Sequence, residues 1–499
     1  MNTSLLLLQG LMLSVALFLR VLPHRFAKGS LSVDHWFWRS YIETYRRDRR
    51  FPPTLPQYLL DEHQWYPPLF PLLMAVFPAA LFARSGFWVS VGIDLLRMAV
   101  LLGTTAWLTS GDIYAVVVAG LIYATSPILI SYNTQLNPRG LGALFLDGAV
   151  LLVIGQLQFD GPVWLWGLAL GLTALILLTH KMTTQLLWFL CLASGLILQD
   201  WRLLALIPGS ILTALILSKG FYWRVMQAHW DIVKFWHRNW RWLQAHPIKE
   251  SPIYGTSGYE TPTKFHQKGL AGVLRHFRYL LGFNLAAWLI LAVSITTAGP
   301  APIVTVVSGI LLWLQLTLLF CVLTVFVPSL KCLGSGYYYL YNAAFPVALQ
   351  AGILSTGSTA SGLLWGTFIG AVVANLIALA FYYRKLRANI QGPESQFEDV
   401  IEFLKEKPHG AVLCFPLQLS ERVAYQTRHP VVWGAHGYGF QRVEPIFPRL
   451  LLPIREVLQR YRVKYLVAQE GYLTPAFLAE LPYESVVKFG NFQVFLTKP

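Results

Sequence analysis

The first residue that could carry chemistry is Asp34, which lies in a polar stretch shortly after the apolar run Leu5–Leu22. At the surface of a membrane, a carboxylate can serve as the general base for an acceptor hydroxyl group, or it can hold a divalent cation. The same residue could instead cap a short helix over residues 34–47, in which Arg39 and Glu43 would pair at i, i+4. The spacing alone is compatible with a catalytic or a capping Asp34.

A second set of candidates is basic and flanks either Asp34 or the ends of apolar runs. An arginine can bind a phosphate group through two parallel hydrogen bonds, and a lysine can neutralise it as a point charge. Basic residues at the ends of membrane helices can also simply extend toward the lipid headgroups. Both interpretations stay open for each of these residues, which are His35, Arg39, Arg139, His180, Lys181 and Lys331.

The remaining titratable candidates are acidic. Asp61, Glu62 and Asp147 are secondary candidates for the same site. Asp94 and Arg97 lie three residues apart within an apolar run, and we expect them to pair with each other on one helix face. The cysteines are scattered, with neither metal-ligand spacing nor a disulfide pattern. The cofactor is therefore unknown, and a divalent cation is only one possibility.

The composition indicates that membrane helices hold these residues. The chain has 499 residues, of which 55% are hydrophobic and only 13% are charged, whereas about 25% are charged in a typical soluble domain. Its mean hydropathy is +0.50. The formal net charge of +15 fits a protein that meets anionic lipid or an anionic substrate. We expect no nucleic-acid partner, because no nucleic-acid-binding module is recognisable.

About eleven apolar runs are long enough to cross a membrane as helices. The first run lacks a preceding basic residue and a small-residue cleavage site, so we interpret it as a retained helix rather than a signal peptide. The runs cover residues 5–22, 87–108, 112–133, 141–158, 162–179, 183–199, 203–218, 281–298, 302–327, 336–354 and 358–383.

From Gln391 onward the composition changes to that of a soluble α/β domain. We expect helices over Ser395–Lys407 and Pro453–Tyr461, the second with a proline in its first turn. The predicted strands are Ala411–Phe415, Val463–Gln469, 484–489 and 492–497. The tail has neither a Gly-rich phosphate loop nor a nucleophile elbow, which favours a binding or structural domain over a second enzyme.

The segment Pro67–Ala83 decides the sidedness of everything that follows it. It is apolar and about long enough to span, but its four prolines favour a re-entrant or in-plane helix. If it spans, the basic loops fall mostly on the cytoplasmic side, as the positive-inside rule prefers. If it lies at the interface, the later loops and the tail face outward together with the first loop.

Three motifs follow one another in the first part of the chain. Asp34-His35-Trp36 comes after the first apolar run, Tyr66-Pro67-Pro68-Leu69 closes the first polar loop, and Asn137-Pro138-Arg139-Gly140 precedes Asp147. In this order they resemble the GT-C superfamily, the polytopic glycosyltransferases that use polyprenyl-phosphate-linked sugars. Members include oligosaccharyltransferases, protein mannosyltransferases and lipid A aminoarabinose transferases. No Asp-x-Asp or Glu-x-Asp pair follows Arg139, so the resemblance does not extend to a metal site of the oligosaccharyltransferase kind.

The resemblance implies a polytopic α-helical membrane protein with about 11 transmembrane helices, juxtamembrane helices and a small C-terminal soluble α/β domain. Residues 1–387 would form the transmembrane domain, with external loops at 23–86 and 219–280, and residues 388–499 the soluble domain. Pro67–Ala83 would then be juxtamembrane. The protein would lie in the cell membrane, with its catalytic loops and C-terminal domain external or periplasmic.

The implied activity is the transfer of a hexosyl or pentosyl group from a polyprenyl-phosphate donor to a glycan, lipid or protein acceptor. Asp34 would be the base, and Arg139, His180 and Lys181 would hold the donor phosphate. The Trp-rich start of loop 219–280 predicts an interfacial helix, either a lid over the donor or a helix that rests on anionic lipid. The alternatives are a carrier or flippase for lipid-linked sugars, and an O-antigen-type ligase or polymerase.

Overall fold

The computed structural model describes residues 3–26, 33–60, 63–79, 86–159, 161–240, 269–282, 284–297, 305–356, 362–389, 393–434, 440–448, 451–470, 473 and 475–497. The chain divides into two compact units. The helical unit consists of Met1–Phe26, Gly86–Trp223 and His276–Lys385. The sheet unit consists of Ala27–Ser85, Arg224–Arg275 and Leu386–Pro499, so it combines the first loop with the C-terminal domain.

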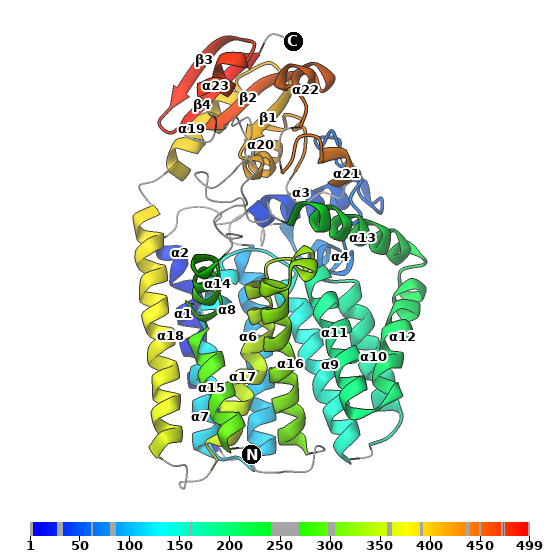
Figure 1. Ribbon diagram of the computed structural model, residues 1–499, viewed down its shortest axis with the longest axis vertical. Helices are drawn as coiled ribbons and strands as arrows, with labels where there is room; N and C mark the ends of the chain where they lie inside the picture. Colours follow the sequence, from blue (N-terminus) through cyan, green and yellow to red (C-terminus); the bar gives the residue numbers. More distant parts are fainter. Residues whose placement is uncertain are drawn as a thin grey trace. The chain divides into compact units, whose positions relative to one another are not determined.

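The helical unit is a bundle of helices that run along a common direction (Figure 1). Its helices are α1 (Thr3–Val21), α2 (Pro23–Phe26), α6 (Phe87–Leu108), α7 (Ile113–Ala124), α8 (Pro127–Tyr132), α9 (Arg139–Phe159), α10 (Trp164–Leu177), α11 (Lys181–Leu198), α12 (Trp201–Leu217), α15 (Leu285–Thr297), α16 (Val306–Phe326), α17 (Leu340–Leu354) and most of α18 (Gly362–Asn389). Short 3₁₀ turns, η4 (Pro328–Leu333) and η5 (Gly336–Tyr339), lead into α17.

Six helical segments in the described ranges are long and apolar enough to cross a membrane, namely α1 with α2, α6, α9, α11, α16 and α18. A seventh is added if α14 (Leu270–Gly282) and α15 form one span. The shorter apolar helices are α7, α10 and α12. The chain is thus a multi-pass membrane protein.

The predicted span over residues 112–133 is wrong as a single helix. α7 ends at Ala124 and α8 begins at Pro127. Pro127 has no backbone N–H group to continue the ladder of α7, and its ring is accommodated at the first position of a new helix. The apolar composition of the run hid this break, because an apolar run has the same hydropathy with or without a turn in its interior.

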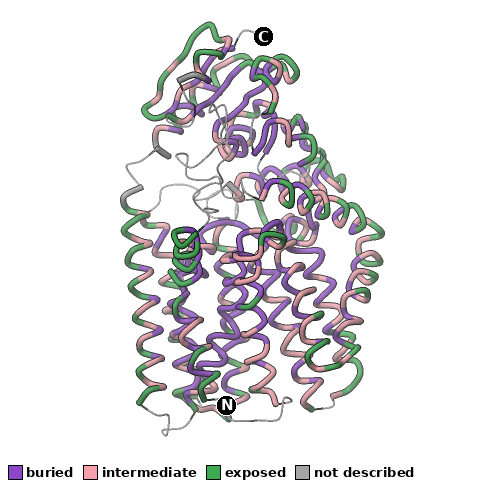
Figure 2. Tube along the Cα trace, in the orientation of Figure 1, coloured by how far each residue is buried: buried purple, intermediate pink, exposed green. Residues whose placement is uncertain are grey.

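α17 is the central helix of the helical unit. Its residues from Leu340 to Gly352 are all buried, and Figure 2 shows its trace as buried along most of its length. It packs against α6, α7, α15 and α16. A helix that is buried all round must satisfy its polar side chains inside the protein, and this places polar residues such as Asn342 in the interior of the unit.

The sheet unit is built on a four-stranded sheet of order β1-β2-β4-β3. β1 (Ala411–Phe415) and β2 (Val463–Gln469) are parallel, and β4 (Phe492–Thr497) is antiparallel to both β2 and β3 (Tyr483–Phe489). All four predicted strands are therefore present. The other elements are α3 (Val33–Asp48), α4 (Leu69–Val76), most of α13 (Phe221–Asn239), α19 (Pro393–Lys405), η6 (Leu417–Leu419), α20 (Ser420–Thr427), α21 (Phe440–Val443), α22 (Ile454–Arg460) and α23 (Pro475–Glu480).

The first loop enters the core of the sheet unit. Leu55 and Tyr58 belong to the same buried cluster as residues of α19, β1 and β2. The backbone N–H groups of Leu59 and Leu60 donate to the carbonyl oxygens of Val431 and Val432 at 3.0 and 3.1 Å. Because Val431 also bridges β1, this stretch of the loop extends the hydrogen bonding of the sheet.

In the described part of the segment Pro67–Ala83, α4 is a short helix. α4 has eight residues, which correspond to a length of about 12 Å, whereas the hydrocarbon core of a membrane is about 30 Å thick. Arg46 of α3 donates hydrogen bonds to the carbonyl oxygens of Met74, Ala75 and Phe77. These carbonyl groups lie at the C-terminal end of α4, where a cation is favourable, so α3 fixes the end of this helix.

α13 contains the predicted Trp-rich helix, and part of its aromatic side packs within the sheet unit. Phe235 is fully buried, and its ring lies 4.9 Å from the ring of Phe440. Arg238 pairs with Glu444 at 2.5 Å. The exposed tryptophan rings are those of Trp223 and Trp230. Residues 241–268 of the predicted loop lie outside the described residues.

Candidate active site

In the helical unit the site is built around Arg139, the first residue of α9. The turn before it is held by Asn137, whose side-chain carbonyl accepts a hydrogen bond from the backbone N–H of Arg139 at 3.0 Å. The amide group of Asn137 donates to the carbonyl oxygens of Tyr132 and Gln135 at 2.9 and 3.3 Å. The Asn-Pro-Arg motif is therefore a rigid helix start that fixes where the arginine side chain leaves the backbone.

The guanidinium group of Arg139 lies among aromatic rings. Its Nη1 donates to the carbonyl oxygen of Tyr338 at 3.1 Å. Its central carbon is 4.4 Å from the ring centroid of Tyr132 and 5.4 Å from that of Tyr338. Among the described residues, none of its contacts is with a carboxylate. A guanidinium group has five N–H donors, so Arg139 keeps an uncompensated charge and spare donors for an anion.

α11 begins beside Arg139, because Nη2 of Arg139 lies 3.8 Å from the sulfur of Met182. His180 is buried and caps this helix, with its Nδ1 accepting the backbone N–H of Thr183 at 3.3 Å. Lys181, the first residue of α11, is half-buried. The start of α11 thus lies beside Arg139. His180 serves as the N-cap of this helix.

Lys331 lies on η4, a few residues before Tyr338 on η5. Its side chain is largely buried, and burial lowers the pKa of its ammonium group. η5 packs against α11 as well as α16. The turn that carries Tyr338 therefore contacts the helix that begins with Lys181, and Lys331 lies on the preceding 3₁₀ turn.

Two buried amides next to Arg139 have polar atoms without a hydrogen-bond partner in the described part of the chain, Nδ2 of Asn133 and Oε1 of Gln135. Unpaired buried polar atoms also occur elsewhere in the described residues, for example Oδ1 of Asn342 and Oε1 of Gln350, so these two make the α8–α9 turn polar without by themselves defining a ligand site. They were missed in the sequence, because isolated amides have no characteristic spacing. The one available signal is the density of amides in Asn133–Asn137.

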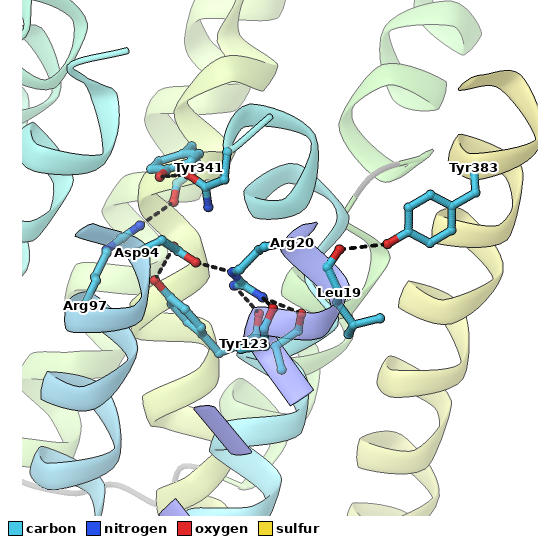
Figure 3. A network of polar contacts seen from close by, with 10 residues as sticks. Leu19, Arg20, Asp94, Arg97, Tyr123, Tyr341 and Tyr383 are labelled. Atoms are coloured by element: carbon cyan, nitrogen blue, oxygen red, sulfur yellow. Dashed lines mark hydrogen bonds and ion pairs between the residues drawn. The ribbon is translucent and has the colours of Figure 1, made fainter. Parts of the chain in front are cut away.

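Asp147, one of the secondary acidic candidates, lies within α9. It is fully buried in α9, and Arg97 of α6 donates two hydrogen bonds to its carboxylate, one of 3.2 Å. Asp94 is also fully buried, where it pairs with Arg20 of α1, as Figure 3 shows. The predicted pairing of Asp94 with Arg97 is therefore wrong, because each charge has a closer partner on another helix.

In the sheet unit, Asp34 lies in the first turn of α3 and is half-buried. The predicted helix is confirmed, and so is its ion pair between Arg39 and Glu43 at 3.5 Å. A carboxylate in the first turn is favoured by the helix dipole.

The buried side of α3 rests on the Tyr-Pro-Pro-Leu segment. The ring of Trp38, which is 1% exposed, lies 4.7 Å from the ring of Tyr66 and 5.5 Å from that of Phe70, edge to face in both contacts. Such aromatic pairs are directional. The motif that closes the first loop therefore forms the packing surface that orients α3 and, through it, Asp34.

The other two candidates on α3 are Arg39, which faces α20, and His35. The guanidinium carbon of Arg39 lies 4.7 Å from the ring centroid of Tyr425, whose hydroxyl group donates to Glu43 at 2.7 Å. The ring of His35 packs edge to face on Trp36 at 5.3 Å. Burial, and secondarily the charge of Arg39, lowers the pKa of His35 to about 4. His35 is therefore neutral at pH 7.

Asp61 and Glu62 lie outside the described residues. Within the part of the chain that the structure describes, there is no group of three or more His, Cys, Asp or Glu side chains that could hold a metal ion. All four cysteines are free and buried.

No protein-family model matches the chain, and no curated protein sequence does either. Solved structures do match. Archaeal oligosaccharyltransferase AglB from Archaeoglobus fulgidus, solved with an inhibitory peptide and a dolichol-phosphate, is 12% identical, with a TM-score of 0.55 over 94% of this chain and 69% of its own. ArnT from Cupriavidus metallidurans, bound to undecaprenyl phosphate, is 12% identical, with a TM-score of 0.60 over 98% of both chains.

At these identities the likeness establishes the fold. The matches extend over most of the chain, so they include both the helical and the sheet unit. The chain has the fold of these two membrane glycosyltransferases, and the predicted resemblance to the GT-C superfamily is confirmed at the level of the fold.

Proposed function

We propose that this protein is an integral-membrane glycosyltransferase that transfers a sugar from a polyprenyl-phosphate donor to an acceptor. The observation that carries the proposal is Arg139, whose charge has no carboxylate partner among the described residues and whose guanidinium group lies among the rings of Tyr132 and Tyr338. Two solved proteins of the same fold were obtained with dolichol phosphate or undecaprenyl phosphate. A lipid-linked phosphate is the anion that fits a site of this kind in a membrane protein.

In the proposed reaction, the oxygen of an acceptor hydroxyl group attacks the anomeric carbon of the donor sugar. The bond between that carbon and the phosphate oxygen breaks, and its electron pair leaves with the polyprenyl phosphate. Negative charge grows on the phosphate as the bond breaks, so fixed cations there lower the barrier. Arg139 would stabilise this charge by a bidentate contact, and Lys181 and Lys331 would add positive charge.

Asp34 is the proposed general base, which accepts the proton of the acceptor hydroxyl group. A single displacement of this kind inverts the configuration of the anomeric carbon and needs one base only. His180 would act by positioning the start of α11. Arg39, stacked on Tyr425, and neutral His35 would act by holding α3 rather than by binding phosphate.

We further propose a topology in which all eleven apolar runs cross the membrane, the run over residues 112–133 as the two successive helices α7 and α8. The first loop and the C-terminal domain would then face the external or periplasmic side, where a glycan, lipid or protein acceptor is available. Residues 1–387 would form the transmembrane domain and residues 388–499 the soluble domain. The shortness of α4 supports a juxtamembrane Pro67–Ala83, which is the feature that this topology requires.

The proposal is tested with the purified protein in detergent and a synthetic undecaprenyl-phosphate-linked sugar. A membrane extract of the protein's own cells supplies the acceptor, and free undecaprenyl phosphate is measured by chromatography. A glycosyltransferase releases undecaprenyl phosphate only when the acceptor is present. A carrier or flippase moves the intact donor between the leaflets of vesicles and releases none, and that outcome would overturn the proposal.

A further inference from the structure

Two buried ion pairs share helix α6, and they differ in what they touch. Asp94 pairs with Arg20 of α1, and Arg97, three residues further along, pairs with Asp147 of α9. All four side chains are fully buried. Figure 3 shows both α6 residues in one polar network. A buried ion pair often stabilises a fold no better than apolar residues of similar size, so a stabilising role alone does not explain them.

The Arg97 pair, unlike the Arg20 pair, makes a hydrogen bond to Tyr341 at the start of α17. Nη1 of Arg97 donates to the carbonyl oxygen of Tyr341 at 3.3 Å, and the guanidinium carbon lies 5.3 Å from the centroid of its ring. Arg20 instead donates to the carbonyl oxygen of Ala124 at 2.9 Å. The two pairs are thus equally buried, and both contact Tyr123, but only Arg97 also donates a hydrogen bond to Tyr341.

Tyr341 in turn packs on the start of α9. Its ring centroid is 6.0 Å from the guanidinium carbon of Arg139 and 5.9 Å from the ring of Tyr132. Its hydroxyl group contacts Oδ1 of Asn133 at 3.5 Å. The backbone approaches so closely at Gly140 that a Cβ atom there would lie 3.3 Å from this hydroxyl oxygen. Tyr341 therefore lines the site around Arg139.

We infer that Arg97 and Asp147 are positioning residues for the donor phosphate. The ion pair fixes Tyr341, and Tyr341 fixes the plane of the Arg139 guanidinium group, which sets the direction of its phosphate-binding donors. This inference rests on the proposed function of Arg139. It assigns to the buried Arg97–Asp147 pair a part in donor binding, and it assigns none to the Arg20–Asp94 pair on the same helix.

The test compares the two pairs as matched substitutions. In one variant Arg97→Met is combined with Asp147→Leu, and in the other Arg20→Met is combined with Asp94→Leu. Each removes both charges of a pair, which avoids leaving a buried charge without its partner. The probe is undecaprenyl phosphate in detergent micelles. The dissociation constant and the midpoint of thermal unfolding are measured for both variants.

We expect the Arg97/Asp147 variant to bind undecaprenyl phosphate about tenfold more weakly than the unsubstituted protein, a change of about 1.4 kcal/mol. The dissociation constant of the Arg20/Asp94 variant should stay within about twofold of that of the unsubstituted protein. Its thermal midpoint should shift by about as much as that of the Arg97/Asp147 variant. Equal dissociation constants for the two variants would overturn the inference and leave the proposed function intact, provided that Arg139→Ala still weakens binding by about tenfold or more. Absence of binding by the unsubstituted protein would overturn both.

A double-mutant cycle tests whether the pair acts through Tyr341. Tyr341→Leu is measured alone and together with Asp147→Asn. If Asp147 acts through the tyrosine ring, the second substitution adds little to the first, so the effects on the dissociation constant are not additive. The parallel cycle with Asp94→Asn should be additive. Additivity in both cycles would contradict a positioning role for Asp147.

Discussion

The hydroxyl group of Tyr58 donates a hydrogen bond to the carboxylate of Glu421, although 363 residues separate the two in the sequence. Tyr58 comes from the first loop and Glu421 from α20, and both are buried. The contact leaves no room for a side chain at Gly434, where a Cβ atom would lie 2.6 Å from Oε1 of Glu421. The loop that carries Asp34 is therefore anchored in the core of the sheet unit.

Removal of the Tyr58 hydroxyl group should destabilise the sheet unit. Tyr58→Phe leaves a buried carboxylate without one of its partners, which costs about 1.5–3 kcal/mol for a hydrogen bond to a charged group. The measurement is the free energy of unfolding of the purified protein. Tyr483→Phe is the control, because Tyr483 is 41% exposed and its hydroxyl group should contribute less than about 0.5 kcal/mol. Equal effects of the two substitutions would show that the anchor is not needed.

His35 should make the protein sensitive to mild acid. Because its pKa is about 4 in the folded state and 6.5 in a solvated chain, the unfolded state binds the proton more readily below about pH 6.5. The contribution of neutral His35 to the free energy of unfolding is therefore complete above pH 6.5 and falls as the pH drops toward 4. The loss between pH 7 and pH 5 is about 1–2 kcal/mol. The check is the thermal midpoint against pH, which should fall less steeply for His35→Gln. Identical slopes would contradict a buried neutral His35.

Much of the sheet unit could be predicted because its signals are local. β1 and β2 have the predicted boundaries, and α3 follows from helical periodicity and the Arg39–Glu43 spacing. The partners of Asp94 could not be predicted. Two charges three residues apart can pair along one helix, and only the tertiary structure brings Arg20 close enough to compete.

The candidate site follows the same division. The position of Arg139 at the end of an apolar run makes it a candidate in the sequence. The structure adds the aromatic rings that surround its guanidinium group. Tyr338 and Tyr341 come from segments about 200 residues away, so no spacing rule connects them to Arg139. Asp147 is a secondary candidate in the sequence but an ion-pair partner of Arg97 in the structure, because a sequence does not show which polar residues of an apolar run face the interior.

Arg139 should be required for binding of undecaprenyl phosphate. Arg139→Ala removes charge and donors, and we expect a loss of about 10- to 100-fold in affinity. The affinity of Arg139→Lys should lie between those of Arg139→Ala and the unsubstituted protein, because lysine keeps the charge and loses the planar guanidinium group. Arg202→Ala is the matched control, since Arg202 also stacks on a ring, that of Trp166 at 5.1 Å, but is neutralised by Asp200 at 2.7 Å. An equal loss for Arg202→Ala would indicate non-specific attraction.

The sidedness of the tail can be measured by cysteine labelling. The four native cysteines are buried, which keeps the background low. Glu402→Cys places a thiol on α19 at a side chain that is 61% exposed, and Thr356→Cys places one at the exposed end of α17. A membrane-impermeant reagent should label the first variant in intact cells and the second only after permeabilisation. The reverse pattern would place the tail in the cytoplasm and make Pro67–Ala83 a span.

The most direct test of sugar transfer at Asp34 is the rate of undecaprenyl phosphate release by Asp34→Asn. An amide cannot accept the acceptor proton, so the rate should fall by about 10²- to 10⁴-fold, while undecaprenyl phosphate still binds. Asp48→Asn, at the other end of α3, carries the same chemical change on a surface residue that pairs with Arg47 and should keep the full rate. Full activity of Asp34→Asn would contradict the assignment of Asp34 as the base.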